Sequence, residues 1–342
     1  MHARSLAIVC VVCVVCVVMA AAACPVTVSA PELQTEPDGG FSDGGGFVLP
    51  GEGEGEGEGE GEGEGEGEGE GEGEGEGEGE GEGEGEGEGE GESDTGILNP
   101  GRSTFVVDVS TGGATVSRTM ELIAPASVDR APLVPAIIAL HGNGDTPSGF
   151  IAALGLQQSA EAIGAVVAVP AGRNRTVRFG TFDFPGIDWD AYNELANNED
   201  LAFVDAIAAR LIATGDVDPQ QIHVFGYSQG GFLAFRTAID RASTIKSAVV
   251  VAAGDPLNDG NRILATARKI PFVLRVGQND AFVDIARAAR NNLIASGHPA
   301  TIVEVAGAGH FPFPIAAGES TSVVVRALLQ QQLLLQQLPA TP

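Results

Sequence analysis

Ser228 stands in the pattern Gly-x-Ser-x-Gly, with Gly226 and Gly230 two residues away on either side. A β-type run over residues 221–225 precedes this pattern, and a helical pattern over residues 229–240 follows it. A sharp turn between a strand and a helix holds its serine in strained backbone angles, and glycines two residues away prevent clashes in that turn. We therefore predict that Ser228 projects above a sheet and acts as a nucleophile.

A serine hydroxyl is a poor nucleophile until a base removes its proton, so a histidine should follow along the chain. His310 comes after the predicted strand 301–305, at the edge of a parallel sheet where catalytic loops gather. His298 stands in the loop before that strand, which is the opposite edge. We therefore expect His310 to be the base.

The base in turn needs a carboxylate that holds its imidazole in the correct tautomer. Asp280 lies in the loop directly after the predicted strand 271–276. Two other aspartates compete for the role: Asp255 follows an earlier strand, and Asp284 falls within a predicted helix over 282–296. We expect Asp280 to be the orienting carboxylate.

Acyl transfer also needs N–H donors for the oxyanion of the tetrahedral intermediate. The backbone N–H of Gln229, directly after the nucleophile, is the expected first donor. The second should come from the glycine-containing loop after the predicted strand 135–140, where we favour Asn143 and keep Gly142 as the alternative. His141 in the same loop is expected to be structural.

Residues 172–198 are unusually rich in aromatic side chains for this chain. The stretch follows a predicted strand, so it should overhang the edge of the sheet that carries the catalytic loops. We predict that Phe182, Trp189 and Tyr192 contact the substrate. The alternative is that these rings only pin a long loop to the core.

The catalytic residues need a sheet that brings distant loops together, and the pattern after residue 97 predicts one. Short apolar runs alternate with helical stretches there, which is typical of a mostly parallel sheet with crossover helices on both faces. The first two strands follow each other without a helix, as an antiparallel pair would. The predicted strands are 103–109, 115–123, 135–140, 165–169, 221–225, 247–252, 271–276 and 301–305, and the predicted helices are 149–163, 198–213, 229–240, 282–296 and 320–338.

The run 218–231, together with residues 140–142 and the loops that carry Asp280 and His310, resembles the polyhydroxybutyrate depolymerase and feruloyl esterase group of α/β hydrolases. The resemblance extends over about residues 104–314 and implies an α/β-hydrolase fold for a catalytic domain over residues 101–342. It also implies a serine esterase without a metal or organic cofactor, which acts on polyesters or on feruloyl or acetyl xylan esters. Many members of the group have a tryptophan directly after the histidine, where this chain has Phe311.

The N-terminal residues 1–24 have the pattern of an export signal, with two basic residues before an apolar run that ends in small residues. Cys24 follows three alanines, as in a lipoprotein cleavage site, and three outcomes remain open: lipidation of Cys24, simple cleavage or an uncleaved anchor. Each outcome places the enzyme outside the cytoplasm, either secreted, periplasmic or at the cell surface. Apart from a lipid anchor or an uncleaved anchor, no membrane contact is expected.

Residues 25–100 lack a sustained apolar periodicity and are predicted to form a disordered linker. Within it, residues 51–92 alternate glycine and glutamate, so the tract repels itself and extends. We interpret it as a spacer. The alternative, that its carboxylates bind divalent cations or a basic partner, lacks a rigid ligand geometry.

The charge of the chain is concentrated in this linker. The chain has 47 acidic and 18 basic residues, but from residue 97 onward there are only 21 acidic and 17 basic ones. This balance gives no indication of a nucleic-acid footprint, and no nucleic-acid partner is expected. All four cysteines lie within the first 24 residues, so the predicted domain has no thiol for a disulfide or a metal. The domain is expected to be a monomer.

The alternative to an esterase is a surface protein whose hydrolase fold only binds a glycan or polymer.

Overall fold

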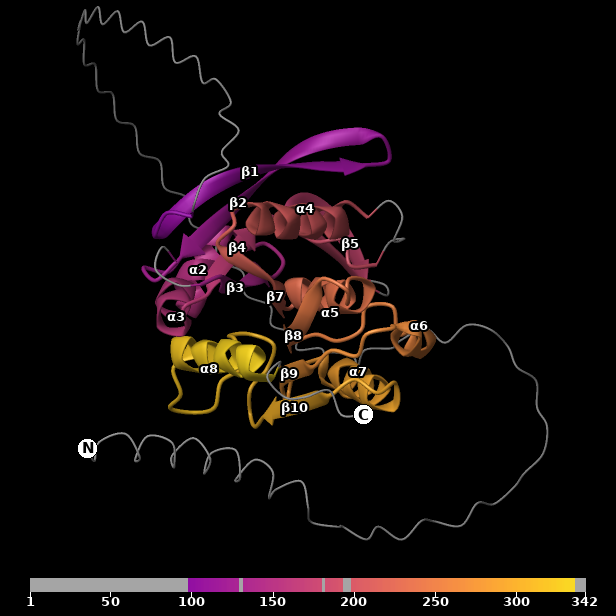
Figure 1. The fold of residues 1–342 in the computed structure, drawn as a ribbon. Helices are drawn as coiled ribbons and strands as arrows, with labels where there is room; N and C mark the ends of the chain where they lie inside the picture. Colours follow the sequence, from indigo (N-terminus) through magenta and orange to yellow (C-terminus); the bar gives the residue numbers. More distant parts are fainter. Residues whose placement is uncertain (1–97, 129–131, 180–181, 193–197, 336–342) are drawn as a thin grey trace, which may run out of the picture. The chain divides into compact units, whose positions relative to one another are not determined.

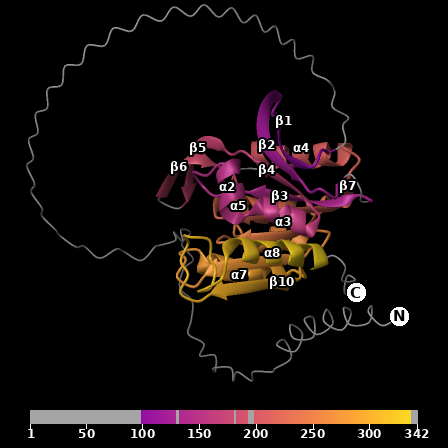
Figure 2. The same cartoon turned by 90° about the vertical axis from the view of Figure 1, so that its left-hand side faces the viewer.

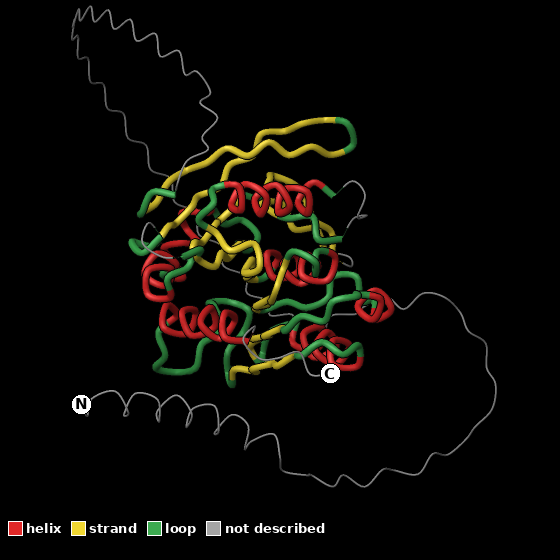
Figure 3. The backbone as a smooth tube through the Cα atoms, viewed as in Figure 1, coloured by secondary structure: helices red, strands yellow, loops and turns green. Residues whose placement is uncertain are grey.

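The computed structural model describes residues 98–128, 132–179, 182–192 and 198–335. Eight strands of this part form one sheet in the order β1-β2-β4-β3-β7-β8-β9-β10. Their bounds are β1 Gly101–Thr111, β2 Ala114–Ala124, β3 Val134–Leu140, β4 Val166–Pro170, β7 Val217–Tyr227, β8 Ile245–Val251, β9 Phe272–Gly277 and β10 Ala300–Val305. Figure 3 shows these strands in yellow, with the helices in red beside them.

The sheet is parallel from β4 to β10 and antiparallel at its entry. β1 pairs with β2 and β2 pairs with β4 in antiparallel register. All other neighbours in the sheet pair in parallel. The prediction of an antiparallel entry pair before a parallel sheet is therefore confirmed. Because the parallel strands end at the same edge, the loops after β3, β7, β8, β9 and β10 lie along one side.

Helices cover both faces of the sheet, as the sequence predicted. α2 and α3 lie with α8 on one side, and α4, α5 and α7 lie on the other (Figures 1 and 2). The bounds are α2 Pro147–Leu154, α3 Leu156–Ile163, α4 Glu199–Ala213, α5 Gln229–Asp240, α6 Gly260–Ala265, α7 Val283–Ala295 and α8 Thr321–Leu334. None of the described helices is long and apolar enough to cross a membrane.

Alternation along the strands separates the core into two layers. In β3, Ile138 packs into the cluster under α4 and α5, whereas Ile137 packs into the cluster under α2, α3 and α8. Val250 and Val249 divide between the same two clusters in β8. A strand that is apolar at every position is the expected pattern for a parallel sheet that is covered on both faces. This pattern is why short apolar runs were sufficient to locate the strands.

Three local features differ from the prediction. The predicted helix 149–163 is two helices, because Gly155 between them has a left-handed backbone with φ 62°. The short helix α6 was not predicted. The aromatic stretch contains an antiparallel hairpin outside the main sheet, made of β5 Arg173–Phe179 and β6 Phe182–Asp188. Charged residues interrupt both strands and a proline interrupts β6, so neither has the apolar run that marked the other strands.

Candidate active site

Ser228 lies in the turn between β7 and α5, with φ 54° and ψ −124°. A positive φ is strained for a residue with a side chain. A Cβ atom on Gly226 would lie 2.1 Å from the carbonyl oxygen of Gly230, and one on Gly230 would lie 2.2 Å from that of Leu140. Both glycines are therefore required by close backbone contacts, and the N–H of Ser228 is held by the carbonyl of Val251 at 2.9 Å.

The structure brings Ser228, His310 and Asp280 into one hydrogen-bonded chain. The Oγ atom of Ser228 lies 2.8 Å from Nε2 of His310, and Nδ1 of His310 lies 2.9 Å from Oδ2 of Asp280. The Asp280 side chain is fully buried, whereas the imidazole remains partly exposed. Oδ1 of Asp280 accepts a hydrogen bond from the N–H of Phe282, which fixes the carboxylate from its other side. The three residues come from the loops after β7, β9 and β10.

Aromatic side chains hold the imidazole in place. The Tyr227 ring stacks on His310 at 5.9 Å, and its hydroxyl donates to the carbonyl oxygen of His310 at 2.5 Å. Burial, together with the nearby charge of Asp280, raises the pKa of Tyr227, so its hydroxyl stays protonated and remains a donor. Phe282 and Phe311 contact the imidazole edge to face at 5.1 and 4.6 Å. The histidine therefore has few other rotamers open to it.

Two backbone segments place N–H groups beside Ser228. A Cβ atom on Gly142 would lie only 3.5 Å from Cβ of Ser228, so the loop after β3 passes directly over the serine. Within the described part of the chain, no hydrogen bond occupies the backbone N–H of Gly142, Asn143 or Gln229. Gln229 also begins α5, whose N-terminus favours negative charge. These N–H groups can therefore stabilise the oxyanion of a tetrahedral intermediate formed at Ser228.

Comparison with known proteins supports the architecture. The model of an alpha/beta hydrolase family matches residues 137–297. The chain has the α/β-hydrolase fold. An S-formylglutathione hydrolase from Agrobacterium tumefaciens superposes with a TM-score of 0.51 at 16% identity, over 68% of this chain and 95% of that one. A ferulic acid esterase superposes with a TM-score of 0.50 at 13% identity, over 70% of this chain and 99% of that one. No curated protein matches the sequence.

The other candidate residues have different partners. Asp255 is buried and paired with Arg262 at 2.9 Å. Asp284 is exposed on α7 and pairs with Arg287. His298 is buried with Nδ1 against the backbone of Ile270, and burial lowers its pKa. Within the described residues, none of these three side chains forms a hydrogen bond with Ser228 or His310.

His141 is fully buried in the loop after β3, and both of its ring nitrogens have backbone partners. Nδ1 lies 2.8 Å from the carbonyl oxygen of Gly142, so this nitrogen carries the proton. Nε2 accepts from the N–H of Gly172 at 3.1 Å. Burial lowers the pKa of His141, which keeps the ring neutral. These contacts agree with a structural role.

The three aromatic residues expected to contact substrate differ in their positions. Trp189 is fully buried, and its Nε1 donates to the carbonyl oxygen of His141 at 2.8 Å. A ring without exposed surface cannot contact a substrate in this conformation, which favours the alternative that Trp189 anchors the loop. Tyr192 is half-buried, and its hydroxyl donates to Oε1 of Gln229 at 3.2 Å, so it lies beside the site. Phe182 lies in β6, and its side chain falls outside the described residues.

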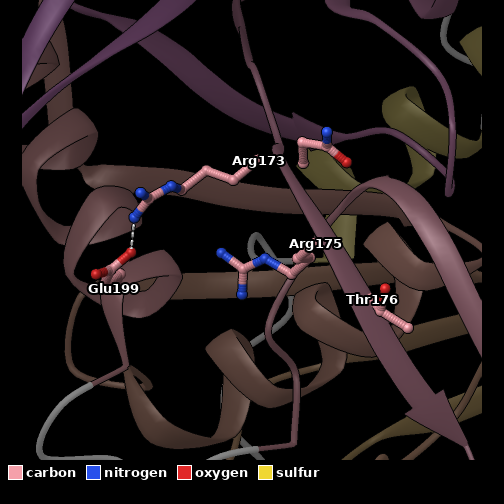
Figure 4. A pocket seen from close by; sticks show the side chains of 5 residues that line it. Arg173, Arg175, Thr176 and Glu199 are labelled. Carbon is pink, nitrogen blue, oxygen red and sulfur yellow. Dashed lines mark hydrogen bonds and ion pairs between the residues drawn. The ribbon is translucent and has the colours of Figure 1, made fainter.

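A cavity of about 350 Å³ lies between the hairpin and the start of α4. Its lining residues are Arg173, Asn174, Arg175, Thr176 and Glu199. Figure 4 shows the side chain of Arg173 directed at Glu199, with which it forms an ion pair. Arg175 lies 3.2 Å from Asp200. The charges of both arginines are therefore balanced by carboxylates.

Among the described residues, no group of three or more His, Cys, Asp and Glu side chains is arranged so that it could hold a metal ion.

Proposed function

We propose that this protein is a serine esterase that hydrolyses carboxylic esters through an acyl-enzyme intermediate. The observation that carries the proposal is the chain of hydrogen bonds from Ser228 through His310 to Asp280 at the sheet edge. The same constellation on unrelated folds performs acyl transfer. The unpaired N–H groups of Asn143 and Gln229 beside the serine supply the remaining element, the oxyanion hole.

The geometry gives each residue one role. Oγ of Ser228 attacks the ester carbonyl carbon while Nε2 of His310 takes its proton, and Asp280 stabilises the imidazolium. The N–H groups of Asn143 and Gln229 donate to the oxyanion. The departing alcohol takes the proton from Nε2, which leaves an acyl group on Ser228. Water then attacks that acyl group with His310 as the base, and the acid is released.

The proposal extends to the substrate class and to the location of the enzyme. The sequence resemblance supports a polyester, feruloyl ester or acetyl xylan ester, and the ferulic acid esterase among the structural neighbours has the same fold. Leu98, at the end of the predicted linker over residues 25–100, is buried in the core and so belongs to the folded part. The export signal over residues 1–24, with lipidation of Cys24 as one outcome, and residues 25–97 of the linker lie outside the described residues. We propose on the sequence alone that they place a monomeric enzyme outside the cytoplasm.

A covalent trap tests the function directly. A p-nitrophenyl phosphonate ester should react with the full chain in a 1:1 ratio, because its phosphorus centre resembles the tetrahedral intermediate and the product cannot be hydrolysed quickly. Peptide mass spectrometry should locate the adduct on Ser228. A chain that binds polymers without catalysis would release no p-nitrophenol, and an adduct on another serine would contradict the assignment of the nucleophile.

Phe311 is expected to influence substrate size. Its ring is 71% exposed and contacts the edge of His310, so it presents apolar surface beside the scissile bond. Phe311→Ala should raise KM for an ester with an aromatic acyl group about 10-fold, while kcat for p-nitrophenyl acetate stays nearly unchanged. Steady-state kinetics on both esters measure this. Val106→Ala, which truncates an exposed side chain on the edge strand β1, is the control. Equal losses on both esters would contradict a role in substrate contact.

A further inference from the structure

The loop that carries the second oxyanion donor is fixed by the hairpin β5–β6. Nδ2 of Asn143 donates to Oδ2 of Asp188 at 2.6 Å, and the N–H of Gly144 donates to the carbonyl oxygen of Ile187 at 2.8 Å. The indole of Trp189 donates to the carbonyl oxygen of His141 at 2.8 Å. The end of β6 and the residue that follows it thus contact the loop at three residues, although the two segments are more than 40 residues apart in sequence.

Asp188 is the charged residue of this contact, and its burial is complete. Oδ1 accepts from the N–H of Trp189 at 2.6 Å, while Oδ2 accepts from Asn143. Among the described residues, no basic side chain lies within ion-pair distance of this carboxylate. Burial raises the pKa of Asp188 to about 6, and the two hydrogen bonds oppose that shift. Burying a carboxylate without an ion pair is costly, and the hydrogen bonds from Trp189 and Asn143 offset part of that cost.

We propose that Asp188 is a positioning residue, which holds the Asn143 side chain so that the Asn143 N–H faces the oxyanion. The inference rests on the proposed esterase function. The side chain of Asn143 is directed at the hairpin, whereas its backbone N–H is unpaired. The hydrogen bond at the side chain therefore restrains the same residue whose peptide N–H donates to the substrate, next to the backbone contacts at His141 and Gly144. Oxyanion donors act only when they are aimed in advance at the position where charge develops.

Asp188→Asn tests this role because the amide keeps the shape of the side chain but has only one acceptor oxygen. One of its two donors, Trp189 N or Asn143 Nδ2, then faces an NH2 group. We expect kcat for p-nitrophenyl acetate to fall about 10–100-fold, with KM changed less than about threefold, because the oxyanion exists only in the transition state. Asp216→Asn is the matched control: it also accepts a backbone N–H through its carboxylate, but lies before β7 at the opposite edge of the sheet.

A double-mutant cycle shows whether Asp188 acts through Asn143. Asn143→Ala keeps the backbone donor and removes its side-chain anchor, so it should lower kcat by a similar factor. Asp188→Asn should then cost less than about threefold more in the Asn143→Ala background, since residues that act as a unit are not additive. The exchange of both residues, Asn143→Asp with Asp188→Asn, restores a donor and acceptor pair and should recover part of the lost kcat. Independent losses in the cycle, or an unchanged kcat in either single variant, overturn the proposal.

Hydrogen–deuterium exchange separates failure of this proposal from failure of the esterase function. Peptides that cover residues 141–145 should exchange faster in Asp188→Asn than in the unmodified chain, whether or not an ester is hydrolysed. If no ester is hydrolysed but exchange rises, the proposed function fails and the anchoring of the loop stands. If the ester is hydrolysed and exchange stays the same, the positioning role is overturned. Should Asp188→Asn not fold, Asn143→Ala gives the same exchange measurement.

Discussion

Ser228→Ala should lower kcat/KM for p-nitrophenyl acetate by about 10⁴-fold or more, because no other group at this position can form the acyl bond. The substitution removes one oxygen and leaves the backbone turn in place. Unfolding temperature should therefore change little. His310→Ala should cause a comparable loss, and the double variant should lose little more, since the two residues act as a unit through their 2.8 Å contact.

Ser159→Ala is the matched control for this measurement. Ser159 is a buried serine on α3, away from Ser228. Its hydroxyl has no hydrogen-bond partner among the described residues. Loss of the Ser159 hydroxyl should leave both kcat/KM and the unfolding temperature near those of the unmodified chain. If Ser228→Ala retained activity within about tenfold of the unmodified chain, the nucleophile would have to be sought elsewhere.

Gly230→Ala should damage both the fold and the activity. Its Cβ would lie 2.2 Å from the carbonyl oxygen of Leu140 and 2.4 Å from that of His141, and neither backbone atom can move without shifting the end of β3. We expect a destabilisation of about 3 kcal/mol, at the upper end of overpacking effects. Because β3 leads directly into the loop of Asn143, kcat should also fall about 100-fold, as a displacement near 1 Å can cause. Thermal unfolding and ester kinetics measure the two effects.

Gly260→Ala provides the comparison at a glycine with space around it. A Cβ on Gly260 would have no neighbour closer than 3.8 Å, and its backbone is not left-handed. Alanine there should be tolerated without loss of activity. A Gly230→Ala variant that unfolds at the same temperature as Gly260→Ala would show that α5 can move away from β3, and the close approach would then not be required.

The sequence could locate the main sheet and the site because both depend on local signals. The buried parallel strands are mostly apolar, so they were visible as short runs, and the alternation of these runs with helical patterns indicated the fold class. Gly226 and Gly230 mark the sharp turn around Ser228, because a side chain at either position would clash with backbone atoms next to that turn. The expected positions of Asp280 and His310 followed from the rule that loops after parallel strands share one edge, and the structure does place them within hydrogen-bonding distance of one another.

The hairpin β5–β6 and its contacts could not be predicted in this way. Its strands pair with each other outside the main sheet and include arginines and a proline, so they carry no apolar period. Aromatic content alone did not distinguish a ring at a pocket from a ring under a loop, and only the burial of Trp189 against His141 separates them.

The sequence by itself therefore determined the class of fold, the turn at Ser228 and the loops from which its partners come. The tertiary structure decided the strand order, the contacts between Ser228, His310 and Asp280, and the attachment of the Asn143 loop to Asp188. The physical reason is range: turns and apolar runs are set by neighbours along the chain. Burial and hydrogen bonds between segments far apart in sequence exist only once the sheet has brought those segments together.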